Sequence, residues 1–174
     1  MAEAIPMTNG WEGKDDAPRE LTTDTYMLGV KPEMIDSLPV EVWQQLHRSL
    51  EFAGGTCAIE DLRPLYMSGE AQLWLIVDGK TNGLLGVVST EIGIYPRAKS
   101  LIMGFCAGVD VKRWLHWLGP LEVWGASKGC TLSEPHGRHG WTRLLKKYGY
   151  EEAYTVFRKR IGGTHEHEEK QDQQ

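Results

Sequence analysis

The 174-residue sequence predicts an α+β (mixed α/β) fold of three layers, in which helices cover both faces of a central mixed sheet. Three observations predict it. Helical periodicity covers most of residues 40–67, three strand-like runs joined by dense turns follow, and the later strand-like runs alternate with helices. Strands joined by short turns are expected to be antiparallel, whereas strands separated by a helix are expected to be parallel neighbours.

The N-terminal part is predicted to contain one short strand and two helices. The apolar run over residues 26–30 is typical of a strand. Apolar residues then recur at helical spacing over residues 40–52, and Gly54-Gly55 ends this helix. Thr56 is predicted to cap a second helix that runs to about Met67, because acids follow it in the first turn, where the helix dipole favours them.

The middle of the chain has strand character. Nearly continuous apolar runs cover residues 71–77, 84–95 and 101–107, and turn-forming residues separate them. This pattern predicts a three-stranded antiparallel meander that is buried on at least one face.

A helix rich in tryptophan is predicted after the meander, with Asp110 as its N-cap candidate. Pro120 falls in mid-helix and predicts a kink or a break, since proline removes a backbone hydrogen bond. The apolar positions recur every three or four residues, at Val111, Trp114, Leu115, Trp117, Leu118, Leu121 and Trp124. We interpret this stripe as core packing rather than as a binding platform.

Three more elements follow the tryptophan-rich helix. A weak strand is predicted near residues 130–133 and a helix over residues 139–147, closed by Gly149. Residues 151–161 alternate in side-chain character and are predicted to form a final strand.

The two flanks of the chain are polar and lack periodicity. Residues 1–22 are predicted to be a mobile N-terminal arm, and residues 162–174 a disordered polar tail. The domain proper is therefore expected to cover residues 23–161.

The composition indicates an ordinary globular chain. It contains no run of 18 or more apolar residues that could span a bilayer, its start lacks the pattern of a signal peptide, and no membrane partner is expected. Three cysteines without CxxC spacing fit a reducing compartment and no metal site. The net charge of −5 argues against nucleic-acid binding.

The charge is unevenly distributed along the chain. Residues 138–160 carry seven Lys and Arg against two Glu, a local balance of +5, so the remainder carries −10. Two interpretations stay open for this basic segment: a solvated helix face, or a patch for a phosphate-bearing ligand.

Several local sequences carry a family resemblance. They are Gln72-Leu-Trp-Leu75, Thr90-Glu-Ile92 with Tyr95-Pro96, Trp114 followed by Gly129-Cys130, and Gly137-Arg-His-Gly-Trp141 followed by Lys147-Tyr-Gly-Tyr150. Together with the element order, they resemble the GNAT acyltransferase superfamily, and more specifically GNAT-like proteins of tailed phages and prophages. The resemblance covers about residues 24–161. It implies a fold in which acetyl-CoA binds where two central parallel strands splay apart.

The resemblance implies a cofactor site and catalytic groups. The strand 101–107 would pair its backbone with pantetheine amides, and the turn after it would lead into a helix N-terminus that holds the pyrophosphate. Acetyl transfer to an amine needs a base, for which Glu91 is the candidate, and an acid for the thiolate, for which Tyr148 or Tyr150 is the candidate. The residues implied at the cofactor are Phe105, Cys106, Ala107, Gly108, Val109 and Arg138.

Some of these residues have a second interpretation. A solvated strand face explains Glu91 equally well. Arg138 either binds a phosphate or carboxylate as a fork donor or pairs within the protein, for example with Glu134. Cys106 and Cys130 are interpreted as buried, unreactive thiols.

The sequence also departs from the superfamily pattern. Members carry a Gln/Arg-x-x-Gly-x-Gly/Ala turn at the pyrophosphate, whereas residues 105–110 contain one glycine and end in Asp110. In the superfamily pattern, Leu145 stands at the position of the tyrosine that protonates the thiolate, and Trp141 stands at the position of a small residue.

Two function hypotheses therefore remain. The first is an acetyl-CoA-dependent N-acetyltransferase that acts on a small-molecule or peptide amine. The second is a GNAT-fold phage protein without catalysis, which acts with a phage or host protein as a virion or host-interaction component, in the host cytoplasm or the virion. An α/β domain without a small-molecule site is a third, simpler interpretation.

Overall fold

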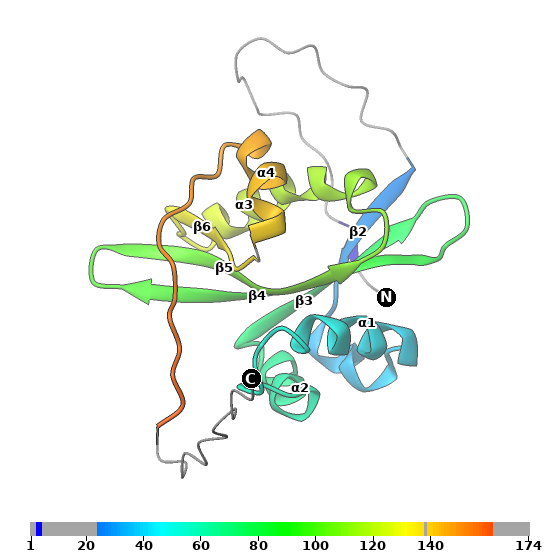
Figure 1. The fold of residues 1–174 in the computed structure, drawn as a ribbon. Helices are drawn as coiled ribbons and strands as arrows, with labels where there is room; N and C mark the ends of the chain where they lie inside the picture. The colour runs from blue at the N-terminus through cyan, green and yellow to red at the C-terminus, as the bar shows by residue number, and fades with distance from the viewer. Residues whose placement is uncertain (1–2, 5–23, 138, 162–174) are drawn as a thin grey trace, which may run out of the picture. The chain divides into compact units, whose positions relative to one another are not determined.

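The computed structural model describes residues 3–4, 24–137 and 139–161 (Figure 1). The chain divides into two compact units, one up to His136 and one from Gly137 onward, and each is described by itself. The first unit contains strands β1 (Glu3–Ala4), β2 (Thr25–Gly29), β3 (Ala71–Asp78), β4 (Leu84–Tyr95), β5 (Ala98–Gly108) and β6 (Leu132–Pro135). Its α-helices are α1 (Val40–Leu50), α2 (Ile59–Ser68) and α3 (Leu118–Ser127), and its 3-10 turns are η1 (Pro32–Ser37), η2 (Val111–Arg113) and η3 (Leu115–Trp117).

The strands form one sheet in the order β1-β2-β3-β4-β5-β6. Neighbouring strands are antiparallel from β1 to β5, while β5 and β6 are parallel because α3 crosses over between them. The predicted antiparallel meander and the predicted parallel pair are therefore both confirmed.

Helices cover both faces of this sheet, as the sequence predicted. Figure 1 shows α1 and α2 on one face and α3 on the other. On the first face, Leu46 of α1 and Tyr66 of α2 are buried in a common cluster with Leu73 of β3 and Val87 of β4. Removing this apolar surface from water is the main driving force for the three-layer arrangement.

The tryptophans form much of the core on the α3 face. Trp74 of β3 and Trp124 of α3 meet edge to face with ring centroids 5.0 Å apart, and the Trp74 Nε1–H donates to Thr90 Oγ1 at 2.9 Å. Trp117 donates in the same way to Thr25 Oγ1 at 3.0 Å. Buried indole N–H groups need such partners, so each ring is fixed in one orientation. The interpretation of the tryptophan stripe as core packing is confirmed for Trp117 and Trp124.

The start of α2 differs from the prediction. Thr56 does not cap the helix, because its hydroxyl donates to the Ala53 carbonyl at 2.8 Å. The helix begins at Ile59, and the Asp61 carboxylate accepts the Ala58 N–H at 2.9 Å. An acid in the first turn thus supplies the cap that was assigned to the threonine.

The predicted helix from Asp110 onward is also different. Asp110 has a left-handed backbone, with φ of 48°, and makes no side-chain cap; η2 and η3 follow it, and the α-helix begins only at Leu118. Pro120 therefore lies in the first turn of α3, where the missing N–H costs no intrahelical hydrogen bond. The break occurs before the proline, not at it.

The second unit contains α4 (His139–Leu145) and the 3-10 turn η4 (Lys146–Tyr148). Gly149 closes them with φ of 83°, and the Tyr150 N–H donates to the Leu145 carbonyl at 3.2 Å, which is a Schellman-type ending. The predicted helix and its closing glycine are confirmed.

One prediction about the flanks of the domain was wrong. Residues 151–161 form no strand in the described chain, although their alternation predicted one, because a strand also needs a neighbour with which to pair. Residues 3–4 pair with β2, and the mobile arm over residues 1–22 stays a prediction. The remainder of the arm and the tail 162–174 lie outside the described residues, and the domain limits 23–161 stay a prediction.

Candidate functional site

The parallel strands β5 and β6 part within the sheet. They pair from Ser100 and Leu132 to Met103 and Pro135, and a last hydrogen bond of 3.0 Å joins the His136 N–H to the Met103 carbonyl. Proline has no N–H to continue the ladder, so the pairing ends here. On the other side of β5, strand β4 stays paired with it as far as Gly108.

A β-bulge lies at the point of parting. Ser89 of β4 pairs with Phe105 and Thr90 pairs with Met103, so Gly104 is an extra residue on β5. A bulge bends its strand and raises the local twist, which turns the rest of β5 away from β6. A Cβ atom at Gly104 would meet no atom within 4 Å, so the bulge faces open space.

Beyond the bulge, residues 105–108 of β5 pair on one side only among the described strands. These are four of the residues assigned to the cofactor: Phe105, Cys106, Ala107 and Gly108. An unpaired strand edge presents N–H and C=O groups that can bind an extended, amide-containing ligand. The structure thus brings this part of the predicted site together on one edge.

Cys106 lies on this edge but is poorly suited to be a nucleophile. Burial raises the pKa of its thiol to about 12, so the thiol stays protonated at neutral pH. This agrees with its interpretation as a buried, unreactive cysteine.

The turn after β5 is held by the core. Val109, half of whose surface is exposed, donates its N–H to the Leu85 carbonyl at 2.8 Å and accepts the Trp114 indole N–H at 2.8 Å. The 3-10 turn η2 follows at once, and a helix dipole acts only near the end of a real helix. The predicted helix N-terminus for a pyrophosphate is therefore absent from this turn.

Glu91, the candidate base, lies in β4 two residues beyond Ser89, so both side chains point to the α1 and α2 face. Glu91 pairs across the sheet with Ala71 of β3 and Ile102 of β5, and it is exposed at the end of the β3 pairing. Because Glu91 is exposed and lies next to the bulged strand, both interpretations of this residue remain: a general base, or a solvated residue of the strand face.

Tyr66 of α2 joins this site, and the sequence did not single it out. The side chain is 2% exposed, and its hydroxyl has no hydrogen-bond partner among the described residues. Burial raises its pKa to about 12; Ser89 opposes this rise, and nearby Cys57 and Glu91 add to it. The phenol therefore stays protonated and can donate to a water or a ligand. An aromatic residue at a core position of a helix gave no signal that its hydroxyl would come within electrostatic range of Glu91.

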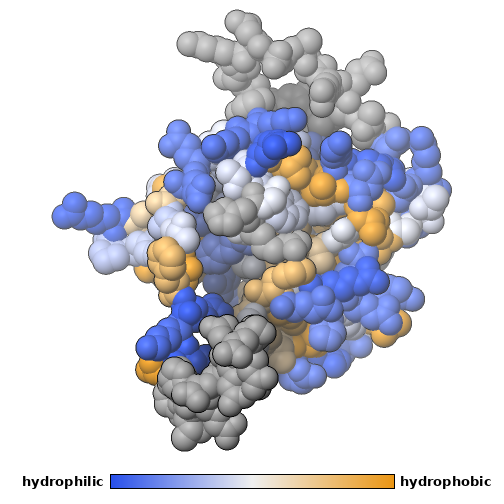
Figure 2. Space-filling model, viewed as in Figure 1, coloured by the Kyte–Doolittle hydropathy of each residue, from blue (hydrophilic) through white to orange (hydrophobic). Residues whose placement is uncertain are grey.

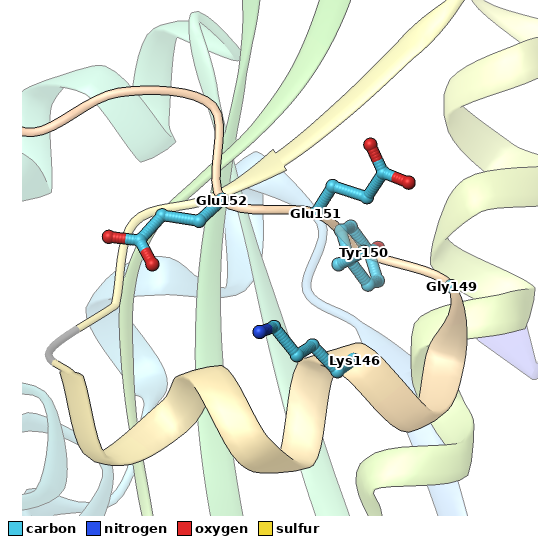
Figure 3. Close-up of a pocket in the computed structure, with 5 residues that line it drawn as sticks. All are labelled: Lys146, Gly149, Tyr150, Glu151 and Glu152. Atoms are coloured by element: carbon cyan, nitrogen blue, oxygen red, sulfur yellow. The ribbon is translucent and has the colours of Figure 1, made fainter.

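The two candidate acids belong to the second unit. Tyr148 is the last residue of η4, and Tyr150 lines a polar hollow of about 520 Å³ with Lys146, Gly149, Glu151 and Glu152 (Figure 3). Arg138 lies outside the described residues. The roles of these three residues stay predictions.

The described residues hold no group of three or more His, Cys, Asp or Glu side chains placed to bind a metal ion. The three cysteines form no disulfide with one another. Among the helices of the described chain, none is both long and apolar enough to cross a membrane.

The described fold and site can be compared with known proteins. By sequence, the chain matches no protein-family model, and no curated protein matches it. By structure, it is similar to acetyltransferases of the GNAT class. A probable acetyltransferase superposes with a TM-score of 0.60 at 12% identity over 79% of this chain and 98% of the other.

Two further solved structures are similar over nearly their whole length. A GCN5-related N-acetyltransferase from Ralstonia eutropha JMP134 has a TM-score of 0.56 at 13% identity, over 80% of this chain and 99% of its own. The aminoglycoside N-acetyltransferase AAC(6')-Iy in complex with CoA has a TM-score of 0.51 at 13% identity, over 79% and 94%. At such low identity these likenesses show the fold: the chain has the α+β fold of the GNAT acetyltransferases.

Proposed function

We propose that the protein is an acetyl-CoA-dependent N-acetyltransferase that acts on a small-molecule amine. The observation that carries this proposal is the parting of β5 from β6 at Gly104, which leaves residues 105–108 with one free strand edge. The GNAT fold supports it, and so does the solved neighbour that contains CoA.

The free edge fits the pantetheine arm of the cofactor better than the turn fits the pyrophosphate. Backbone groups of Phe105 to Gly108 would pair with the pantetheine amides, as in strand addition. Asp110 and the short turn η2 offer neither a glycine-rich loop nor a helix end to the phosphates. We therefore expect cofactor affinity to depend mainly on the edge of β5.

Acetyl-CoA, when bound, would supply the acetyl group as an activated thioester. The protein's part is to deprotonate the attacking ammonium of the acceptor and to hold the reacting groups in place. Glu91 would accept this proton through a water molecule, and the neutral Tyr66 hydroxyl beside it would donate a hydrogen bond to the same water. Tyr148 or Tyr150 would serve as the acid for the thiolate, and Arg138 would bind a phosphate.

The proposed acceptor class is suggested by the solved structures of similar fold. Among the solved proteins of this fold are aminoglycoside acetyltransferases, which include one solved in complex with sisomicin. Their names support a polyamine-type small molecule as the acceptor of this protein. A carboxylate such as Glu91 near the reacting amine would favour a cationic substrate.

One observation favours a second candidate function, a GNAT-fold protein without catalysis. The turn after β5 has Asp110 in a left-handed conformation and two 3-10 turns where a phosphate-binding helix would be needed. A carboxylate at this position repels a pyrophosphate. The relation to phage proteins, the phage or host partner and a place in the virion belong to this second candidate and rest on the sequence resemblance.

Isothermal titration with acetyl-CoA tests the proposal. Gly104→Leu would place a side chain in the open space at the parting, and we expect it to abolish the binding heat. Gly119→Leu is the matched control, because a Cβ at Gly119 of α3 also meets no atom within 4 Å; it should bind like the wild type. Absence of heat with the wild-type chain at millimolar acetyl-CoA would refute the enzyme hypothesis.

Glu91→Gln tests the base separately from the cofactor site. With an aminoglycoside acceptor, we expect kcat to fall by roughly 10²–10⁴-fold, the usual contribution of a general base. Affinity for acetyl-CoA should not change. Equal kcat values for the wild type and Glu91→Gln would show that Glu91 is only a solvated strand residue.

A further inference from the structure

Two buried side-chain oxygens that the proposed mechanism does not use have no hydrogen-bond partner among the described residues. They are the Oγ atom of Ser100, a residue that is 0% exposed, and the Oε2 atom of Glu134. Folded proteins pair nearly all of their buried polar groups, because an unpaired oxygen has lost its water without compensation. A ligand that donates hydrogen bonds to these two oxygens would remove that cost.

Both residues lie on the face of the sheet that also carries Glu91. Glu91 of β4 pairs with Ile102 of β5, and Ile102 pairs in turn with Glu134 of β6. Paired residues of neighbouring strands point to the same face, so the two glutamates flank Ile102, and we call these three residues the acidic row. Ser100 precedes Ile102 by two residues and therefore shares this face. Neighbouring strands lie about 4.8 Å apart, which separates the Cα atoms of Glu91 and Glu134 by roughly 10 Å.

The surface between the two glutamates is apolar. Ile102 leans over Gly93, because a Cβ atom at this glycine would lie 2.5 Å from Ile102 Cδ1. Leu132, the β6 partner of Ser100, is 49% exposed and extends the apolar surface. Figure 2 shows the same close mixture of hydrophobic and strongly hydrophilic side chains on the visible surface of the molecule. Carboxylates at both ends of an apolar surface match a molecule with a hydrophobic stem between two cationic groups.

The Glu134 carboxylate is held in place by one of its oxygens. Its Oε1 atom accepts a hydrogen bond from the Tyr95 hydroxyl at 3.5 Å, which leaves Oε2 for a further donor. The residue is partly exposed, so a small ligand can approach its carboxylate from solvent. Ser100 lies diagonally across from Glu134 on the neighbouring strand, a spacing that one ligand can bridge. An ammonium group carries several N–H donors and no acceptor, which is what two unpaired acceptor oxygens require.

We propose that the acidic row selects acceptors with two ammonium groups: the reacting amine lies at Glu91, and a second ammonium binds Glu134 Oε2 and the Ser100 hydroxyl oxygen. This inference rests on the proposed transferase function and adds to it two residues that determine specificity. A charge-assisted hydrogen bond is stronger than a neutral one, so the second ammonium adds affinity and fixes the orientation of the acceptor. A monoamine leaves both oxygens unpaired and is therefore a poor substrate.

Transfer from acetyl-CoA to matched amines tests the specificity of the full chain. Cadaverine and pentylamine share one carbon chain, but only cadaverine has a second amine. We expect kcat/KM for cadaverine to exceed that for pentylamine about tenfold or more, the effect of one hydrogen bond between charged groups. Glu134→Gln should lower the value for cadaverine to that for pentylamine and leave pentylamine unchanged. Glu33→Gln is the matched control, because Glu33 of η1 is an exposed carboxylate outside the acidic row, and it should keep the wild-type ratio.

Calorimetric titration with spermidine tests binding apart from catalysis. Spermidine should bind the wild type in the absence of acetyl-CoA, and Glu134→Gln should raise its Kd about tenfold or more. Ser100→Ala is a second variant that keeps the fold, because it removes only a buried hydroxyl without a partner. Its Tm should stay unchanged or rise, while its Kd for spermidine should rise several-fold. A residue with a purely structural role would not change stability and binding in opposite directions.

The outcomes separate this inference from the transferase function on which it rests. Equal kcat/KM for cadaverine and pentylamine would overturn it, and so would an equal loss for both amines in Glu134→Gln. A structural pair between Glu134 and Arg138 would instead lower the Tm of Glu134→Gln and leave the ratio between the amines unchanged, which would also overturn it. If no amine is acetylated, the transferase function fails. The ammonium site then stands if Glu134→Gln and Ser100→Ala weaken the binding of spermidine, and it falls if they do not.

Discussion

The Arg113 guanidinium donates to the Asp78 carboxylate with 2.7 Å between Nη2 and Oδ2, and this pair joins the turn after β5 to the hairpin between β3 and β4. The Asp78 Oδ1 atom also accepts the backbone N–H groups of Lys80 at 2.8 Å and Thr81 at 3.0 Å. One side chain thus organises a hairpin turn and fixes the segment that follows the candidate cofactor edge.

The Asp78–Arg113 pair predicts a pH-dependent stability. The hydrogen bond from Arg113, followed by those from Thr81 and Lys80, lowers the pKa of Asp78 to about 2. A carboxyl whose pKa is lower in the folded state stabilises the fold above its unfolded pKa of about 3.9, and this contribution is lost as the pH falls toward 2. Asp78→Asn should therefore lower the Tm at pH 7.

Urea unfolding of the wild type and Asp78→Asn from pH 7 down to pH 2 measures this dependence. The difference between their free energies of unfolding should be constant above about pH 5 and shrink below pH 4. Asp36→Asn is the control, because the Asp36–Arg63 pair is mostly exposed and should contribute little. A difference that does not vary with pH would mean that Asp78 acts through its shape and not through its charge.

Two glycines of β5 should respond in opposite ways to the same substitution. A Cβ at Gly108 would lie 2.5 Å from the Leu85 carbonyl oxygen and 2.8 Å from the Gly86 Cα, and both atoms are backbone. At Gly104 nothing lies within 4 Å. Gly108→Ala should therefore destabilise the fold by about 1–3 kcal/mol, the usual cost of overpacking, while Gly104→Ala should be close to neutral.

Chemical denaturation of the two alanine variants decides this prediction. The m-value should stay constant while the midpoint falls for Gly108→Ala. Equal midpoints would show that β4 and β5 can separate at this end of the hairpin, which would contradict the close approach at Gly108.

The unpartnered hydroxyl of Tyr66 makes a prediction about stability. Removal of a buried polar group without a partner removes its desolvation cost, so Tyr66→Phe should leave the free energy of unfolding unchanged or raise it by up to about 1–3 kcal/mol. Trp74→Phe is the control, because the Trp74 indole N–H has a partner in Thr90 and its loss should destabilise the fold. Calorimetry measures the unfolding of both variants, Tyr66→Phe and Trp74→Phe.

A lower Tm for Tyr66→Phe would contradict this expectation. It would mean that Ser89 or a bound water already satisfies the hydroxyl in the free protein.

Much of the fold could be predicted because its determinants are local. The meander follows from three apolar runs with turn residues between them, and the end of α4 follows from Gly149, which alone adopts a left-handed backbone there at low cost. The tryptophan stripe was interpreted as core packing from its spacing, and the burial of Trp114 and Trp117 confirms this.

The candidate site was predictable only in part. The edge residues 105–108 were assigned through the family resemblance. The structure places them together on one strand edge, and their role at a cofactor stays a prediction. Tyr66 was missed, because sequence spacing places the ring of a core tyrosine but does not say what its hydroxyl faces. The prediction of a helix that begins at Asp110 was wrong, because Asp110 itself is left-handed and two 3-10 turns come before the helix begins at Leu118.

The sequence by itself therefore determined most of the buried side chains and most of the helical and strand segments, since periodicity records burial. Only the tertiary structure decided which backbones pair. It parts β5 from β6 at a bulge, brings the Tyr66 hydroxyl close enough to Glu91 for their charges to interact, and leaves residues 151–161 without a strand partner among the described residues. The physical reason is that side-chain pattern is a property of one segment, whereas a strand's hydrogen bonds belong to two segments that the sequence does not name together.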